Sequence, residues 1–269
     1  MRNILEQMKR GYAKIDSLSQ WNFFYNLPSA WFNRLCALYI DNSNRQFNVD
    51  YEFINRIAKL TKYNGLGELN ICDPDGLQNF NFLKRIFVDQ LYLSSSNLDL
   101  EGLTDAGGIS VLMFQTGREL YDLTPISRHN ELSALDIHCS RMGSIRPLNE
   151  LKQLSSLGLH GFLSNCSELC YLDCFKESHK TDLLLNENKL EDMDALTYIY
   201  APIISLDSNC ISDLHPLETI VNHNLHHTYG FEISVRDNPI SPQDRQLVLH
   251  TIKNLPESKG KFPKLRFFL

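Results

Sequence analysis

The chain has 269 residues, a hydrophobic fraction of 43% and a formal net charge of −6. These values allow one large or two small globular domains and exclude collagen-like, low-complexity and disordered classes. The acidic balance argues against nucleic-acid binding, because contact with phosphates requires a basic face.

No apolar run approaches the roughly 18–20 residues that span a bilayer. The first ten residues, MRNILEQMKR, are charged and lack the apolar core of a secretory signal. The seven cysteines are odd in number and scattered, which does not indicate a disulfide framework. We therefore expect a cytoplasmic protein that makes no contact with a membrane.

Residues 1–34 are predicted to form a helical and aromatic N-terminal cap. The segment WNFFYNLPSAWF places both tryptophans and three phenylalanines close together. Five apolar residues before it follow helical spacing: Ile4, Leu5, Met8, Tyr12 and Ile15.

Residues 35–240 contain an internal repeat, which the 42 leucines and 23 asparagines of the chain already suggest. Three segments align most clearly: LDIHCSRMGSIRPL, LLLNENKLEDMDAL and ISLDSNCISDLHPL. In each, two leucine-type residues stand two positions apart, and Ser140, Asn188 or Asn209 stands five positions after the first. Looser copies give about eight or nine units in all, with starts at Leu38, Leu69, Leu91, Leu112, Leu157 and Ile233.

The period near 22 residues resembles the leucine-rich repeats of bacterial internalins and of the leucine-rich regulatory subunit of protein phosphatase 1. The resemblance implies an α/β solenoid, a leucine-rich repeat horseshoe with a parallel concave sheet and convex 3₁₀ or short helices. Units longer than average are expected to carry true helices. In the unit from Leu157, this expectation falls on SELCYLDCF, where Leu169, Leu172 and Phe175 have helical spacing.

Residues 241–269 are predicted to form the C-terminal cap. Ser241, Pro242 and Asp244 are typical of a helix start. The final GKFPKLRFFL either adds one more strand or lies over this cap.

The concave face that this register defines is acidic. Its slots hold nine acids and one base, Arg236; the acids are Asp41, Glu68, Asp73, Asp136, Asp182, Glu187, Asp207, Glu232 and Asp237. The slots also hold Tyr39, Tyr92 and Met113, which are possible apolar anchors. We therefore predict a monomer that binds one basic protein partner on this face, without nucleic acid. The expected contact residues are Tyr39, Glu68, Tyr92, Met113, Gln115, Asp136, His138, His160, Asp182, Asn186, Asp207 and Arg236.

The role of such a protein stays open at this stage. An immunity or antitoxin protein that masks a basic toxin fits the acidic face, and a phosphatase-type regulator fits the repeat. No nucleotide-binding, hydrolase or zinc-protease motif is present, so we expect neither an enzyme nor a cofactor.

Three groups of residues offer a metal-dependent alternative. The repeat register brings Asp136, His138 and His160 together on the concave face, close enough to share a metal or to form a pH-sensitive patch. The weaker candidates are the spaced thiols Cys166, Cys170 and Cys174 and the histidines His223, His226 and His227, for which packing and solvent exposure are the favoured interpretations.

Overall fold

The computed structural model describes residues 2–83, 87–161, 167–176, 181–224, 230–253 and 265–269. The chain divides into two compact units, Met1–Ala134 and Leu135–Leu269, called here the N-terminal unit and the C-terminal unit. Among the described helices, none is long and apolar enough to cross a bilayer.

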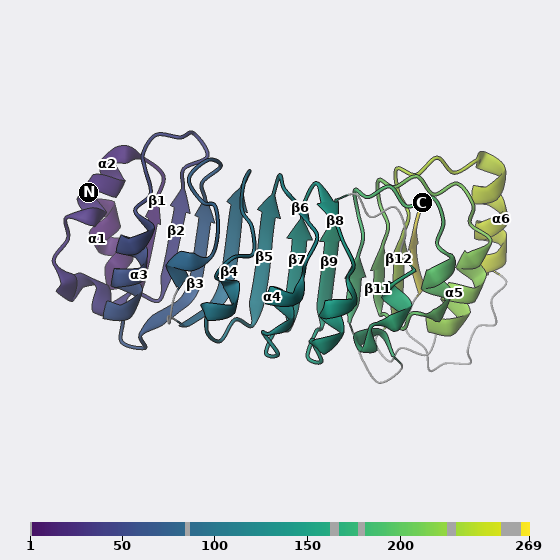
Figure 1. Ribbon diagram of the computed structural model, residues 1–269. Coiled ribbons are helices and arrows are strands. Elements are labelled where there is room, and N and C mark those ends of the chain that lie inside the picture. Colours follow the sequence, from purple (N-terminus) through teal and green to yellow (C-terminus); the bar gives the residue numbers. More distant parts are fainter. Residues whose placement is uncertain (1, 84–86, 162–166, 177–180, 225–229, 254–264) are drawn as a thin grey trace. The chain divides into compact units, whose positions relative to one another are not determined.

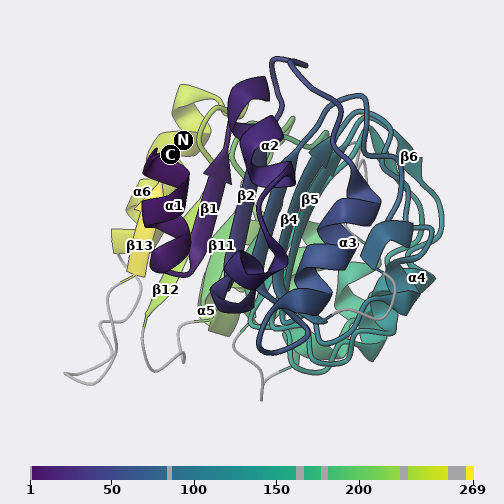
Figure 2. The same cartoon turned by 90° about the vertical axis from the view of Figure 1, so that its left-hand side faces the viewer.

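A parallel sheet forms the framework of the N-terminal unit (Figure 1), and each strand of this sheet pairs with the next. The strands are β1 Tyr12–Ile15, β2 Ala37–Asp41, β3 Gly65–Cys72, β4 Phe87–Ser95 and β5 Val111–Thr116, followed by the two-residue β6 Glu119–Leu120. The helices are α1 Arg2–Lys9, α2 Leu18–Tyr25, η1 Ser29–Arg34, α3 Tyr51–Leu60, η2 Asn81–Leu83, η3 Leu103–Asp105 and α4 Thr124–Ser127. Figure 2 shows α1 beside β1 and α3 on one face of the strands.

The C-terminal unit repeats this arrangement, with neighbouring strands in chain order apart from the two-residue β8. Its strands are β7 Ala134–His138, β8 Arg141–Met142, β9 Ser156–His160, β10 Asp182–Leu184, β11 Ile203–Ser205, β12 Phe231–Ser234 and β13 Leu265–Phe268. Its helices are η4 Arg146–Glu150, η5 Leu169–Tyr171, η6 Asp173–Phe175, η7 Asp194–Tyr198, α5 Pro216–Asn224 and α6 Pro242–Lys253.

The core of each unit consists of the paired leucine-type residues, because alternate residues of a strand point to opposite faces of the sheet. These side chains are at most 3% exposed: Leu38, Ile40, Leu69, Ile71, Leu91, Leu93, Leu112, Phe114, Leu135, Ile137, Leu157, Leu159, Leu183, Leu185, Ile204, Leu206, Ile233 and Val235. The repeat register is therefore confirmed, including the copy that starts at Leu38. The parallel strands, helical connections and buried repeat positions confirm the predicted leucine-rich repeat fold.

Buried asparagines join the last repeats of the C-terminal unit to one another. Asn188, Asn209 and Asn238 occupy the predicted slot and are at most 6% exposed. The Nδ2 atom of Asn209 donates to the carbonyl oxygens of Leu185 at 2.8 Å and Leu206 at 2.9 Å. The asparagine amides thus satisfy main-chain acceptors where the chain leaves the strand, which a buried turn requires.

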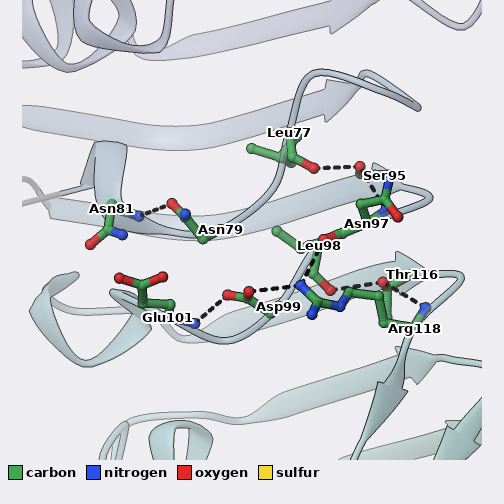
Figure 3. Close-up of polar contacts among 10 residues, drawn as sticks. All are labelled: Leu77, Asn79, Asn81, Ser95, Asn97, Leu98, Asp99, Glu101, Thr116 and Arg118. Carbon is green, nitrogen blue, oxygen red and sulfur yellow. Dashed lines mark hydrogen bonds and ion pairs between the residues drawn. The ribbon is translucent and has the colours of Figure 1, made fainter.

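The buried polar position lies one residue earlier in the N-terminal unit. The alignment places Ser43, Pro74, Ser96 and Gly117 in the slot, but the buried residues are Asn42, Asp73, Ser95 and Thr116. Figure 3 shows two of them: Ser95 Oγ donates to the Leu77 carbonyl at 2.5 Å, and Thr116 Oγ1 donates to the Leu98 carbonyl at 2.7 Å.

A backbone difference explains this shift. We call the buried residues Asn188, Asn209 and Asn238 the asparagine ladder. The residue before each of them has a left-handed φ, of 58° at Glu187, 58° at Ser208 and 57° at Asp237. That residue turns the chain, so that the following side chain points inward. At the equivalent positions of the N-terminal unit φ is not positive, and the earlier side chain enters the core instead.

Polar side chains also shape the turns that lead into the helical side of the repeats. Asp99 Oδ1 accepts the main-chain N–H of Glu101 at 2.9 Å, and Asn79 Oδ1 accepts that of Asn81 at 3.0 Å (Figure 3). Asp192 and Asp213 accept the N–H groups of Asp194 and His215 in the same way. Such Asx-turns offer the backbone a local partner before the helical turn begins.

The N-terminal end of the chain differs from the expected cap, whereas the predicted C-terminal helix is present. Tyr12 and Ile15 belong to strand β1 rather than to the first helix, because Gly11, with φ of 91°, ends that helix and turns the chain. At the other end the predicted helix is present as α6, and Ser241 Oγ accepts the N–H of Asp244 at 3.1 Å. The tail adds a strand: β13 pairs in parallel with β12.

The expected helix over SELCYLDCF is also different. The segment forms the 3₁₀ helices η5 and η6, because the extended backbone of Leu172, with ψ of 125°, separates them. Leu169, Leu172 and Phe175 are nevertheless buried. The long unit from Ile204 does carry a true helix, α5.

Candidate functional site

The open sheet face of the C-terminal unit, opposite the buried leucines, brings together the polar residues that the register predicts. We call it the open face and define it by Asp136, His138, His160, Asp182, Leu184, Asn186, Ile203, Asp207, Glu232 and Arg236. It is not uniformly exposed: His160 is buried, Arg236 is exposed, and the other eight are intermediate.

Asp136, His138 and His160 form one cluster on this face. The Oδ1 atom of Asp136 lies 3.4 Å from Nε2 of His138 and 3.3 Å from Nε2 of His160. The two imidazole rings are stacked, with centroids 4.1 Å apart and an interplanar angle of 8°. The other ring nitrogen of His160, Nδ1, lies 2.9 Å from the carbonyl oxygen of Asn186.

The cluster strongly perturbs two of these groups. Burial by itself raises the pKa of Asp136, but the two imidazoles outweigh burial and hold this pKa well below its usual range. Burial lowers the pKa of His160, yet the contact with Asp136 outweighs burial and raises this pKa overall. The arrangement favours a carboxylate with positive charge beside it.

Gly158 leaves room for the cluster. A Cβ atom at Gly158 would lie 2.7 Å from Asp136 Oδ1 and 3.2 Å from His160 Nε2, closer than ordinary contacts allow. Any other residue at this position would push the carboxylate and the imidazole apart.

Asn186 and Asp207 continue a line of polar contacts across the next strands. Asn186 Oδ1 accepts the N–H of Asp207 at 2.9 Å and the hydroxyl of Ser205 at 2.7 Å. Asp207 Oδ1 repeats the pattern one strand further, accepting the N–H of Arg236 at 2.8 Å and the hydroxyl of Ser234 at 2.5 Å. Both predicted contact residues therefore also hold the backbone of the next repeat.

Asp182 and Glu232 flank an apolar patch. Leu184 lies on β10 beyond Asp182, and Ile203 on β11 pairs with Glu232 on β12. Burial and the nearby charge of Glu232 raise the pKa of Asp182. Among the described residues Asp182 has no cationic partner, so its charge is uncompensated.

Sequence reasoning missed a second base on this face. Arg266 on β13 pairs in register with Glu232 and approaches its carboxylate, with a 3.6 Å distance between Nη1 and Oε2. The Arg236 guanidinium lies 4.4 Å from the ring centroid of Phe268. The tail segment LRFF does not match the repeat pattern, so nothing in the sequence indicated that Arg266 and Phe268 would lie on this face. Only the pairing of β13 with β12 shows it.

The predicted contact residues of the N-terminal unit share a row of their own sheet. Tyr39, Asn70, Tyr92 and Met113 are register partners on β2, β3, β4 and β5, and Gln115 follows on β5. The Tyr39 hydroxyl donates to Glu68 Oε2 at 2.7 Å, which raises the pKa of Tyr39 to about 12.

An open groove of about 680 Å³ lies beside Tyr39. Tyr12 and Lys14 of β1 contribute to its lining, together with Asp41. These β1 residues were missed because the first helix was predicted to continue through them.

Asp73 is a correction to the predicted acidic face. It is only 3% exposed, and its carboxylate accepts hydrogen bonds from Asn42 Nδ2 at 2.9 Å and from the Tyr51 hydroxyl at 2.5 Å. Burial and this contact raise the pKa of Tyr51. Asp73 therefore stabilises the interior and offers no charge to a partner.

The cysteine and histidine groups that we weighed as weaker candidates form no described cluster. Cys166, His226 and His227 lie outside the described residues. Cys174 is buried, and burial raises the pKa of its thiol to about 12. The six described cysteines are free thiols.

Comparison with protein-family models and with curated proteins gives no match. Among solved structures, the chain is similar to internalin C2 of Listeria monocytogenes, with 16% identity over 98% of this chain and 92% of that chain and a TM-score of 0.42. An internalin (inlF) of the same organism gives 15% identity over 98% and 84%, with a TM-score of 0.43. A leucine-rich repeat protein of Leptospira interrogans gives 16% identity over 95% and 82%, with a TM-score of 0.49.

Proposed function

We propose that the protein is a non-catalytic binding scaffold that captures a basic protein partner on the open face of its C-terminal unit. One observation carries this proposal: half-buried Ile203 lies in register between Asp182 on β10 and Glu232 on β12, and half-buried Leu184 follows Asp182 on the same face of β10. An apolar centre with charged neighbours is the composition of a protein-binding patch.

The charge of this patch favours a cationic partner. Burial and the negative charge of Glu232 raise the pKa of Asp182, as expected for a poorly solvated carboxylate beside another acid. A lysine or arginine of a partner placed beside Asp182 and Glu232 relieves that repulsion. It also brings the apolar stem of its own side chain onto Ile203.

Complementary charge affects recognition mainly through the rate of association and the exclusion of wrong partners. A role in masking a basic protein, such as a nuclease toxin, fits a face of this kind. In that role the scaffold needs no chemistry of its own, because covering the partner's basic surface is sufficient to block its contact with phosphates.

The test compares capture by two charge-reversal variants. Tagged wild-type protein, Asp182→Lys and Glu218→Lys are incubated with lysate of the native source, and bound proteins are quantified by mass spectrometry. Asp182→Lys adds its positive charge to the patch, whereas Glu218→Lys makes the same change at an exposed position of α5.

We expect one basic protein to be captured by the wild type and by Glu218→Lys but lost with Asp182→Lys. Its association should slow as salt rises, because the Debye length falls to about 10 Å at 0.1 M. Equal capture by all three proteins, or loss with Glu218→Lys alone, would show that the partner binds elsewhere.

A further inference from the structure

The cluster of Asp136, His138 and His160 contains a buried carboxylate oxygen to which neither histidine donates a hydrogen bond. One ligand-type atom from each residue can be chosen so that all three lie within 4.8 Å of one another. The contacts of Asp136 Oδ1 with the imidazoles lack hydrogen-bond geometry. This atom is the one buried side-chain oxygen or nitrogen in the described part of the chain without a hydrogen-bond partner.

The tautomer of His160 determines what its Nε2 atom presents to Asp136. The carbonyl oxygen of Asn186 can only accept, so Nδ1 of His160 must carry the proton of their 2.9 Å contact. In the neutral ring Nε2 then holds a lone pair, which faces the carboxylate oxygen of Asp136 at 3.3 Å. In that neutral state two electron-rich atoms face each other, and either a proton on Nε2 or a metal ion bound to both atoms removes the repulsion.

The two oxygen-to-nitrogen distances fit a small divalent ion. Zinc binds imidazole nitrogen and carboxylate oxygen at about 2.0–2.2 Å in a tetrahedral arrangement, so neighbouring ligand atoms are about 3.3 Å apart. The two oxygen-to-nitrogen distances are 3.4 Å and 3.3 Å. A metal-binding histidine usually donates its other N–H to a carbonyl or carboxylate, as His160 does to Asn186.

Space and access also suit an ion. Gly158 leaves the centre of the cluster open, because a Cβ there would contact both Asp136 Oδ1 and His160 Nε2. His160 is held in place, with its side chain 10% exposed, while the His138 side chain is 43% exposed. Since stacked parallel rings cannot aim both Nε2 lone pairs at one point, binding requires the exposed His138 ring to tilt.

We propose that Asp136, His138 and His160 form a site for one divalent transition-metal ion, with its fourth position open to solvent at the sheet face. Two imidazoles and one carboxylate are ligands that zinc, nickel and iron accept, whereas magnesium and calcium prefer oxygen alone. This site lies on the same open face as the proposed partner patch, since Gly158 pairs in register with Leu184, but its test needs no partner.

The test uses full-length protein treated with a chelator under reducing conditions, with zinc chloride as the probe in calorimetric titration. We expect one ion per chain in the wild type. His138→Ala should weaken binding by more than about 100-fold, because loss of even an outer partner costs about 10–100-fold. Because the His138 side chain is 43% exposed, we expect His138→Ala to fold as the wild type does. Asp136→Asn is a second variant of the site, and circular dichroism tests whether it is folded.

The matched control is His215→Ala, which removes a histidine from another Asp–His pair, that of Asp213 and His215. It should bind zinc as the wild type does. Cobalt provides a spectroscopic signature, because the proposed ligands give a visible spectrum without a sulfur-to-metal band, whereas exposed Cys36 or Cys210 would produce that band.

Zinc binding that survives in His138→Ala or is lost in His215→Ala would overturn the assignment, and so would a cobalt spectrum with a thiolate band. So would the absence of one-to-one binding in the wild type, which would leave an imidazolium of His160 as the partner of Asp136.

Discussion

Replacement of Asn209 by alanine should strongly destabilise the C-terminal unit. The Asn209 side chain is buried, donates to two carbonyl oxygens at 2.8 Å and 2.9 Å, and accepts the N–H of Leu190 at 3.2 Å. Each internal hydrogen bond contributes about 1 kcal/mol net, and a buried group left without a partner costs about 1–3 kcal/mol. We therefore expect Asn209→Ala to lower the free energy of unfolding by about 3 kcal/mol.

Urea denaturation followed by far-ultraviolet circular dichroism measures this loss as a lower midpoint at unchanged slope. The control is Asn222→Ala, which changes an exposed residue of helix α5 and should leave the midpoint almost unchanged. Because the chain has two compact units, the unfolding curve is first examined for a separate transition of each.

A second variant distinguishes lost hydrogen bonds from lost volume. Asn209→Asp keeps the shape but places carboxylate oxygens against the carbonyl oxygens of Leu185 and Leu206, which the amide now contacts as a donor. It should cost at least as much as alanine at neutral pH. If Asn209→Asp were as stable as the wild type, or if alanine cost less than about 1 kcal/mol, the ladder would not hold the repeats together.

Three further predictions concern other positions. Leu185→Asp buries an unpaired charge among the core leucines and should unfold the C-terminal unit at room temperature, which circular dichroism detects. Asp207→Asn keeps the acceptor for the Arg236 N–H and should be nearly as stable as the wild type in urea, whereas Asp207→Ala should lose about 1–2 kcal/mol. Tyr39 should ionise near pH 12. The measurement is a pH titration of the difference in tyrosinate absorbance between the wild type and Tyr39→Phe. Because this folded-state pKa lies above the ordinary value of about 10, the contact with Glu68 stabilises the fold below pH 10 and ceases to do so as pH rises through 12. A value near 10 would refute the contact.

The strands and their core could be predicted because they depend on residues that recur at fixed spacing. Leu183, Leu185, Ile204 and Leu206 repeat an alternation that only one face of a sheet satisfies, so their burial follows from the register. The same register brought Asp136, His138 and His160 into one cluster.

The roles of individual polar residues could not be predicted in this way. Asp73 and Asp207 occupy slots that the register counts as free acids, yet Asp73 is buried and Asp207 holds the next strand. Which hydrogen bonds a carboxylate makes depends on residues from other repeats, such as Tyr51 and Ser234, whose distance in the sequence carries no regular spacing.

The two units differ in which polar residue of each repeat points into the core, and the local backbone conformation decides this difference. A left-handed φ costs a residue other than glycine about 1–2 kcal/mol, and Glu187, Ser208 and Asp237 all adopt it. The asparagine that follows offsets this cost by making three or four hydrogen bonds with main-chain groups. In the N-terminal unit a hydroxyl can make the inward contact without the left-handed residue, as Ser95 and Thr116 do. An asparagine five positions after the first leucine therefore implies a left-handed residue before it, as at Ser208. A serine or threonine four positions after that leucine enters the core where no asparagine follows it, as at Ser95 and Thr116.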